Sequence, residues 1–176
     1  MKPGKAKHTA IRRFVREGEG ATAVEFALVA PAFIALLFAI LQTALVFFVQ
    51  QVLQTATLQA ARQIMTNQAQ AANMTQGQFQ AAVCANTGGL FNCGGIYAAV
   101  QTFTSFPSVT MFNPISNGKF QSGGMPFSPG VPGDIEVVQV FYQWPVWSGP
   151  LSFTLSNTSG GNSDVIVATA AFRNEP

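Results

Sequence analysis

The sequence Gly20-Ala21-Thr22-Ala23-Val24-Glu25, with the apolar run from Phe26 to Val49 behind it, decides the fold of this chain. The run has 24 residues and carries no charge. As a helix it would be about 36 Å long, enough to cross a hydrocarbon core of about 30 Å. A secretory signal has an apolar core of only about 7–15 residues. The stretch therefore predicts a transmembrane helix over residues 21–49.

Basic residues gather in front of this helix. Six of the nine Lys and Arg residues precede Gly20, namely Lys2, Lys5, Lys7, Arg12, Arg13 and Arg16. Positively charged flanks stay in the cytoplasm, so residues 1–20 are expected to form a cytoplasmic leader and the rest of the chain to be exported. A charged flank is not a basic surface on a folded domain, so nucleic-acid binding is not predicted.

Residues 50–74 are expected to continue the helix outside the membrane, because neither Gly nor Pro occurs between Ala32 and Gln76. Pro31 is expected to kink the helix or to loosen its first turns. Glutamines, including Gln54, are expected on one face of the continuation. The opposite face carries an apolar stripe at spacings of three and four, made of Val49, Leu53, Ala56, Ala60 and Ile64.

Residues 75–176, called the head from here on, are expected to combine a short helix with a small sheet. Thr75-Gln76-Gly77-Gln78 has the capping-box pattern and predicts a helix that ends near Cys84. Strands are expected over residues 96–103, 135–144 and 165–172, with the second in the centre because it is apolar on both faces. A helix followed by strands indicates an α+β fold, with an antiparallel sheet of about three strands. The Pro- and Gly-rich connection over 105–133 is expected to be functional or mobile.

Glu25 is an ionisable residue at the mouth of a membrane segment, where a charge is disfavoured by roughly 2–3 kcal/mol. If a peptidase cuts after Gly20, Ala21 gains a free amine one helical turn from Glu25. The carboxylate can then pair with that amine, or with the amine of a neighbouring subunit. Alternatively, Thr22-Ala23-Val24-Glu25 is a capping box at the start of the helix. The two interpretations are compatible, and the residues leave both open.

A set of sequence blocks runs through nearly the whole chain. It comprises Arg12-Arg13-Phe14, Glu17 to Val29, Pro31, Ala60-Ala61-Arg62, Phe79-x-x-x-Val83-Cys84, Cys93, Gly133 to Val138, Tyr142-Gln143-Trp144-Pro145 and Ala168 to Pro176. Together these blocks resemble TadE-like proteins, which are pseudopilins of the tight-adherence (Flp-type) pilus systems of bacteria. TadG- and TadF-like proteins share the N-terminal block, and the C-terminal blocks favour the TadE-like family.

The resemblance implies a pilin-like fold and cleavage by a prepilin peptidase at Gly20–Ala21, with Glu25 and Phe26 acting in recognition and assembly. It implies a single pass through the bacterial inner membrane with a periplasmic head, and a minor role in pilus assembly or adhesion. The expected partners are other pilin-like subunits and pilus assembly proteins. The alternative is a signal-anchored envelope protein whose head binds a partner without joining a filament.

Cys84 and Cys93 are expected to form a disulfide, because an exported segment lies in an oxidising compartment. Two thiols alone are too few to hold a metal ion, and no cofactor is expected. Trp144 and Trp147 belong to an aromatic segment that is either core on the strand or a partner surface, with Trp147 the more exposed member.

An enzyme is not predicted. Catalysis requires a base, a nucleophile or a metal held together, and the single histidine, His8, lies in the leader. No motif pairs two acids beyond Glu25, and Asp134 after Pro132-Gly133 is expected to be a turn residue. The sequence therefore predicts no catalytic residue and no small-molecule substrate.

Overall fold

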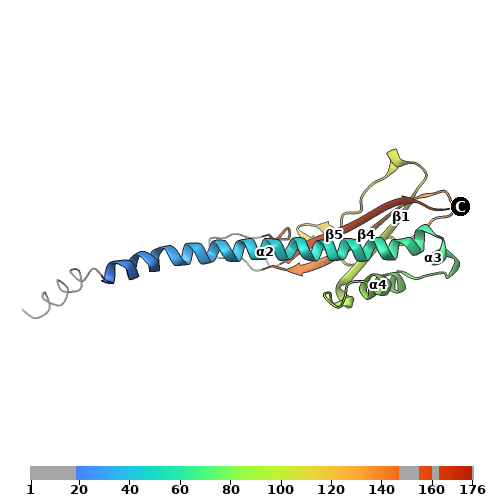
Figure 1. The fold of residues 1–176 in the computed structure, drawn as a ribbon. Helices are drawn as coiled ribbons and strands as arrows, with labels where there is room; N and C mark the ends of the chain where they lie inside the picture. Colours follow the sequence, from blue (N-terminus) through green and yellow to red (C-terminus); the bar gives the residue numbers. More distant parts are fainter. Residues whose placement is uncertain (1–18, 147–154, 160–162, 176) are drawn as a thin grey trace, which may run out of the picture.

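One long helix dominates the molecule, and a small head packs against its C-terminal half (Figure 1). The computed structural model describes residues 19–146, 155–159 and 163–175. The long helix, α2, covers Glu19–Met65 and continues through Pro31 without a break in its assignment. It ends at Met65, before the expected boundary at residue 74, because Asn67 adopts the left-handed conformation with φ of 57°.

Two short helices follow α2. A single turn, α3, covers Gln68–Ala71, and α4 covers Gln76–Ala85. The predicted capping box is present at the start of α4: the Thr75 side chain accepts a hydrogen bond from the backbone N–H of Gln78, and the Gln78 side chain accepts one from the backbone N–H of Thr75 at 2.8 Å. The reciprocal bonds satisfy two backbone donors and set where the helix begins.

The head contains an antiparallel sheet of three strands, β1 (Ile96–Phe103), β4 (Ile135–Pro145) and β5 (Ser163–Arg173). Their spatial order is β1-β4-β5, so the strand with apolar residues on both faces is central, as predicted. The α+β fold class is therefore confirmed, with the helix first and the sheet behind it.

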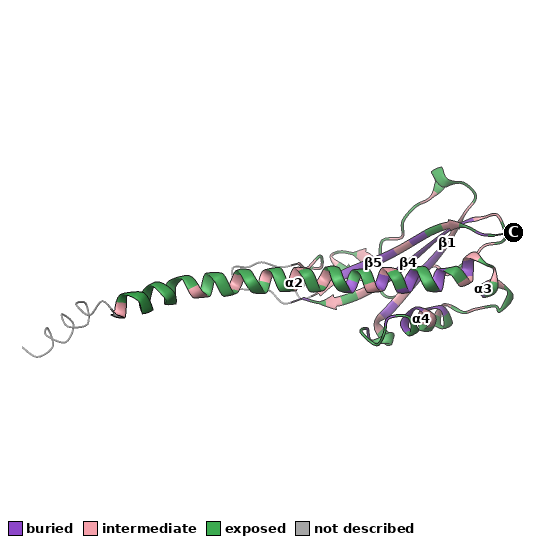
Figure 2. Ribbon diagram, viewed as in Figure 1, coloured by how far each residue is buried: buried purple, intermediate pink, exposed green. Residues whose placement is uncertain are grey.

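The apolar stripe of α2 forms the centre of the core. All five of its members are 0% exposed, namely Val49, Leu53, Ala56, Ala60 and Ile64. They pack with Phe79 and Val83 of α4 and with one face of the sheet, so the predicted stripe is confirmed (Figure 2). Because a buried Val, Leu or Ile side chain stabilises a fold by about 1.5–3 kcal/mol, this stripe holds the helix to the head.

The long connection before β4 covers the other face of the sheet. It contains the 3-10 turn η2 (Phe106–Ser108) and a small hairpin of β2 (Ile115–Ser116) and β3 (Lys119–Phe120). Phe112, Ile115 and Phe120 pack on a second cluster around Phe141. The backbone N–H of Phe112 also donates to Gln139 Oε1 at 2.7 Å. This part of the connection therefore acts as a cover of the core.

Side-chain amides occupy the outer edge of β5. Gln54 Nε2 donates to the carbonyl of Thr169 at 2.8 Å, and Gln54 Oε1 accepts from the N–H of Thr169 at 3.1 Å. Asn157 makes the same pair of bonds with Val165, at 3.0 and 2.8 Å. The expectation that Gln54 lies on the face opposite the apolar stripe was wrong, because its side chain contacts β5, on which α2 packs. The amide also satisfies backbone groups of the edge strand that could otherwise pair with another chain.

Candidate processing and assembly site

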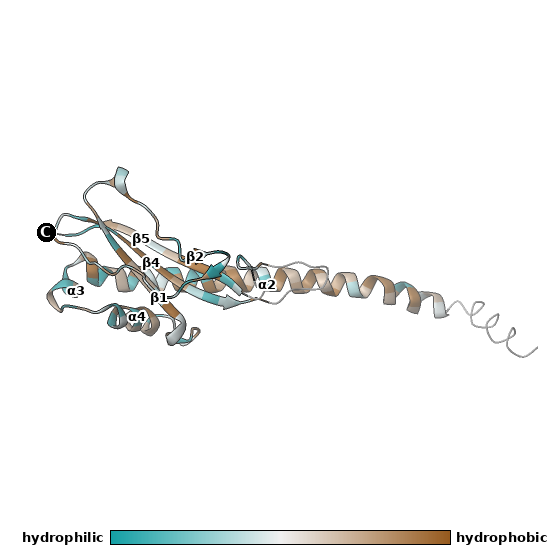
Figure 3. Ribbon diagram, turned by 180° about the vertical axis from the view of Figure 1, so that it is seen from behind, coloured by the Kyte–Doolittle hydropathy of each residue, from teal (hydrophilic) through white to brown (hydrophobic). Residues whose placement is uncertain are grey.

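The N-terminal half of α2 presents large apolar side chains on every side. Phe26 is 73% exposed, Leu28 75% and Phe38 61%. Only 11% of the most apolar 18 consecutive residues of the helix are buried in the molecule. Figures 2 and 3 show this half as exposed and largely hydrophobic. A helix with this surface is unstable in water and fits a single-pass membrane anchor.

The four residues expected to act in processing and assembly lie on the first turns of this helix. Gly20, Ala21, Glu25 and Phe26 all belong to α2, and Ala21, Glu25 and Phe26 are exposed. Since 3.6 residues complete a turn, Ala21 and Glu25 lie on the same face, one turn apart. A free amine on Ala21 would therefore lie near the carboxylate of Glu25.

The capping interpretation of Thr22 does not hold in the intact chain. Helix α2 already begins at Glu19, so Thr22 lies within the helix and not at its N-cap position. Glu25 makes no ion pair with any residue that the structure describes. In a membrane this carboxylate would need a partner, because an isolated charge is disfavoured there.

Residues 20–62 match a family model described as TadE-like protein. The chain carries a TadE-like N-terminal segment. This match covers the exposed half of α2 and most of its buried half, and it confirms the resemblance to TadE-like proteins over these residues. The TadE-like family is pilus-associated and structural, and it is not known as enzymatic. No curated protein and no solved structure gives a significant match.

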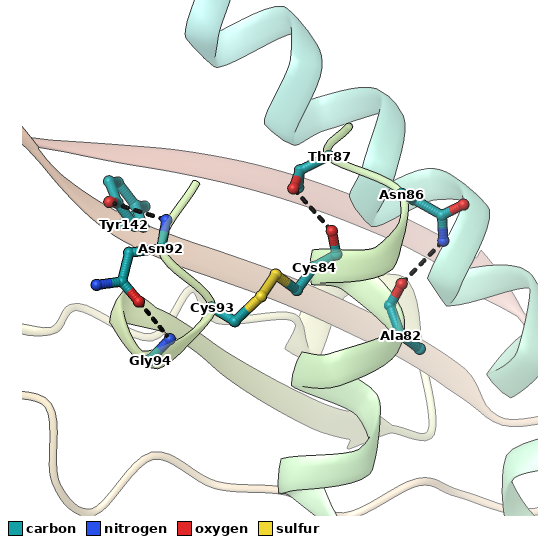
Figure 4. The surroundings of a disulfide bond; sticks show 8 residues. All are labelled: Ala82, Cys84, Asn86, Thr87, Asn92, Cys93, Gly94 and Tyr142. Atoms are coloured by element: carbon teal, nitrogen blue, oxygen red, sulfur yellow. Dashed lines mark hydrogen bonds between the residues drawn. A yellow bond between two sulfur atoms is a disulfide. The ribbon is translucent and has the colours of Figure 1, made fainter. Parts of the chain in front are cut away.

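The predicted disulfide joins Cys84, near the end of α4, to Cys93, at the start of the 3-10 turn η1 (Cys93–Gly95), with the two Cα atoms 5.5 Å apart. Hydrogen bonds hold both ends of the closed loop (Figure 4). The Thr87 hydroxyl donates to the carbonyl of Cys84 at 2.7 Å, and the N–H of Gly94 donates to Asn92 Oδ1 at 3.1 Å. The bridge fixes α4 to the 3-10 turn that leads directly into β1.

Trp144 belongs mainly to the core. It is half-buried, and its ring lies 6.1 Å from that of Phe91 and 6.3 Å from that of Tyr142, between centroids. These rings pack at the margin of the cluster formed by α2, α4 and the sheet. Trp147, the other half of the expected partner surface, lies outside the described residues.

A buried carboxylate, not singled out from the sequence, lies at the opposite end of the sheet. Glu136 on β4 is 0% exposed, and its Oε1 accepts from the N–H of Gly130 and from Asn174 Nδ2, both at 2.6 Å. Within the described residues Oε2 has no partner. Burial, with a smaller contribution from the charge of Asp134, raises the pKa of Glu136, although the two hydrogen bonds act in the other direction.

The signal for Glu136 was present in the sequence. Even-numbered positions of β4, including Val138 and Val140, face the core, and Glu136 has the same parity. Asp134 has the expected turn geometry, since its Oδ2 accepts from the N–H of Val131 at 3.1 Å. Glu136 thus joins three segments: the long connection, the central strand and the C-terminal tail.

The described residues contain no group of three or more His, Cys, Asp or Glu side chains arranged for a metal ion.

Proposed function

We propose that this chain is a minor pseudopilin of a tight-adherence pilus system, cut by a prepilin peptidase after Gly20. The observation that carries the proposal is the exposed apolar half of α2, which matches the TadE-like family and has Gly20 and Glu25 at its start. A peptidase at the membrane surface would need a small residue before the cut, and Gly20 has no side chain. The new amine of Ala21 then lies one turn from Glu25.

Glu25 acts in assembly by pairing with an N-terminal amine. In the lipid the carboxylate has a poor environment, and in a helical bundle an amine of the same or a neighbouring subunit compensates its charge. Charge compensation of this kind would favour movement of the helix from lipid into a filament. The partners would be a prepilin peptidase and other pilin-like subunits, which offer helices of similar surface.

The domain organisation follows from the same proposal. Residues 1–20 are a cytoplasmic leader, residues 21–49 include the membrane helix, residues 50–74 leave the membrane, and residues 75–176 form an exported head. The basic leader supports an orientation with the N-terminus inside, and the disulfide supports an oxidising compartment for the head. The proposed location is the bacterial inner membrane, with the head in the periplasm.

Sequencing the N-terminus of the protein from membranes of its own host tests the proposal. An N-terminus at Ala21 is expected. An intact Met1 would contradict processing and favour a signal-anchored envelope protein that binds its partner without joining a filament.

A further inference from the structure

Helix α2 and strand β5 run side by side in the same direction, and two contacts set their alignment. Gln54 bonds both backbone groups of Thr169, and the carbonyl of Met65 accepts from the N–H of Glu175 at 3.0 Å. The eleven-residue step along α2 from Gln54 to Met65 therefore covers the same length as the six-residue step from Thr169 to Glu175. Continued backwards from Thr169, the same ratio places the start of β5 beside Thr43. Figures 1 and 3 agree, because in both views the sheet reaches the middle of α2.

Side-chain packing gives the same alignment. Val49 is 0% exposed and Val46 is partly buried, and both pack on the cluster that includes Trp144. One face of the last turn of the apolar run is therefore covered by the head. Gln42 and Thr43 are the first markedly polar residues of the run, and both are half-buried at this level.

The N-terminal end of β5 is unsuited to hydrocarbon. Ser163 and Asp164 are polar, and the β5 edge beside them is held by the side chains of Ser156 and Asn157. Transfer of these polar side chains from water into hydrocarbon costs free energy, most of all for the carboxyl group of Asp164. The hydrocarbon around α2 must therefore end on the N-terminal side of Thr43.

We propose that the end of the sheet forms a lipid-contacting rim and that the membrane span of α2 ends near Leu41, not at Val49. The membrane rim consists of Trp144 and Pro145 on β4 and Ser163 and Asp164 on β5, which pair with each other. Two helical residues, about 3 Å of rise, separate Leu41 from Thr43. A headgroup layer is about 5–8 Å thick, so the membrane rim lies within it. The inference rests on the membrane anchoring in the proposed function.

The new boundary also determines where the membrane span of α2 begins. A hydrocarbon core of about 30 Å requires about 20 residues, which counted back from Leu41 begin near Thr22. Glu25 then lies about one turn inside the hydrocarbon, and the Gly20–Ala21 bond lies at the inner surface. With the boundary at Val49, the same count would begin near Ala30 and would leave Glu25 outside the lipid.

Spin-label depth measurements on the full-length chain test the boundary. Single cysteines replace Leu37, Leu41, Leu45 and Phe48, which are 42%, 64%, 49% and 58% exposed, in vesicles of three parts phosphatidylcholine to one part phosphatidylglycerol. Because Cys84 and Cys93 are joined, the label reacts at the introduced thiol. The label at Leu37 is expected to collide mainly with oxygen, which concentrates in hydrocarbon. The label at Phe48 is expected to collide mainly with a water-soluble nickel complex. A label at Phe48 that is as protected from nickel as the label at Leu37 would overturn the inference.

A second pair of labels tests the membrane rim itself. Pro145→Cys lies in the rim. Ala71→Cys on α3, which follows the C-terminal end of α2, is the matched control, and both positions are exposed. Nickel ions bound to chelating lipid headgroups are expected to increase the spin relaxation rate of the Pro145 label several-fold more than that of the Ala71 label. Equal relaxation would overturn the lipid contact. Flotation of the vesicles separates the two proposals: a chain that does not float fails the membrane anchoring, whereas a floating chain with its boundary at Phe48 fails only this inference.

Discussion

The two halves of α2 are both rich in apolar residues and have opposite surroundings. Phe26 and Leu28 in the N-terminal half are largely exposed, whereas Leu53 and Ile64 in the C-terminal half are 0% exposed. The C-terminal half confines its apolar residues to a stripe and surrounds them with glutamine, as a helix does when a folded domain covers one face. The N-terminal half has no such restriction, and its large apolar side chains are exposed on every side, which fits a membrane anchor. One continuous helix therefore joins an exposed apolar segment to a segment that folds with the head.

The largest effect is expected at the first turn. Gly20→Phe should leave essentially all of the chain as uncut precursor, because a bulky side chain occupies the place of the glycine before the cut. Immunoblots of host membranes measure the size of the product. The unfolding midpoint of the head should not change, since Gly20 lies far from the core. Product of normal size from this variant would contradict the processing proposal.

Glu25→Gln should separate processing from assembly. The variant is expected to be cut normally after Gly20 and to fail to support pili, because the neutral amide cannot compensate an N-terminal amine. Electron microscopy of the host counts the pili, and N-terminal sequencing checks the cut. Val24→Ala, a neighbouring exposed position, is the control and should retain pili. Normal piliation by Glu25→Gln would remove the pairing role.

A matched pair of leucines measures the difference between the halves. Leu53→Ala should lower the free energy of unfolding of the head by about 2–5 kcal/mol, because it leaves a cavity among fully buried side chains. Leu41→Ala, at a position that is 64% exposed, should change it by less than about 0.5 kcal/mol. Denaturant titration of the full-length protein in detergent gives both values. Equal losses would show that both halves support the head.

The disulfide contributes the next largest effect. Replacing Cys84 and Cys93 together by Ser should lower the free energy of unfolding by about 2–3 kcal/mol, as the loop-entropy relation gives for a loop of about ten residues. The same denaturant titration measures the loss. Reductant should destabilise the unmodified chain by a similar amount and leave the double variant unchanged. Insensitivity of the unmodified chain to reductant would contradict the contribution of the bridge.

Glu136 should give the smallest effect, which depends on pH. Its pKa in the folded head lies above its ordinary value of 4.5, so the folded state holds the proton more tightly than the unfolded state. The free energy of unfolding should therefore fall as the pH rises from 4.5 through the raised pKa, by about 1.4 kcal/mol for each unit of difference. Glu136→Gln should flatten this dependence between pH 4.5 and 8. Glu175→Gln, an exposed acid on the same tail, is the control, and identical pH profiles of both variants would exclude Glu136 as the source.

The sequence predicted the elements well because their signals are local. The capping box at Thr75 specified the start of α4, and apolar residues on both faces of the second strand specified its central place. Other features depended on contacts between distant segments. Gln54 was expected to face away from the stripe, and its bonds to Thr169 became visible only with β5 beside α2. The end of α2 at Met65 was missed because no Gly or Pro marks it; Asn67 turns the chain there.

The sequence by itself determined that the chain has a membrane-type helix, a Gly20-to-Glu25 spacing and an α+β head, since hydrophobic length, periodicity and capping are properties of neighbouring residues. Only the tertiary structure decided how much of that helix is free for lipid. Hydropathy treats Phe26 to Val49 as one run, because it measures each side chain without its neighbours. The packing of Val49 on the sheet takes the end of the run into the head. The same holds for Glu136, whose burial follows from the connection and the tail that close over it.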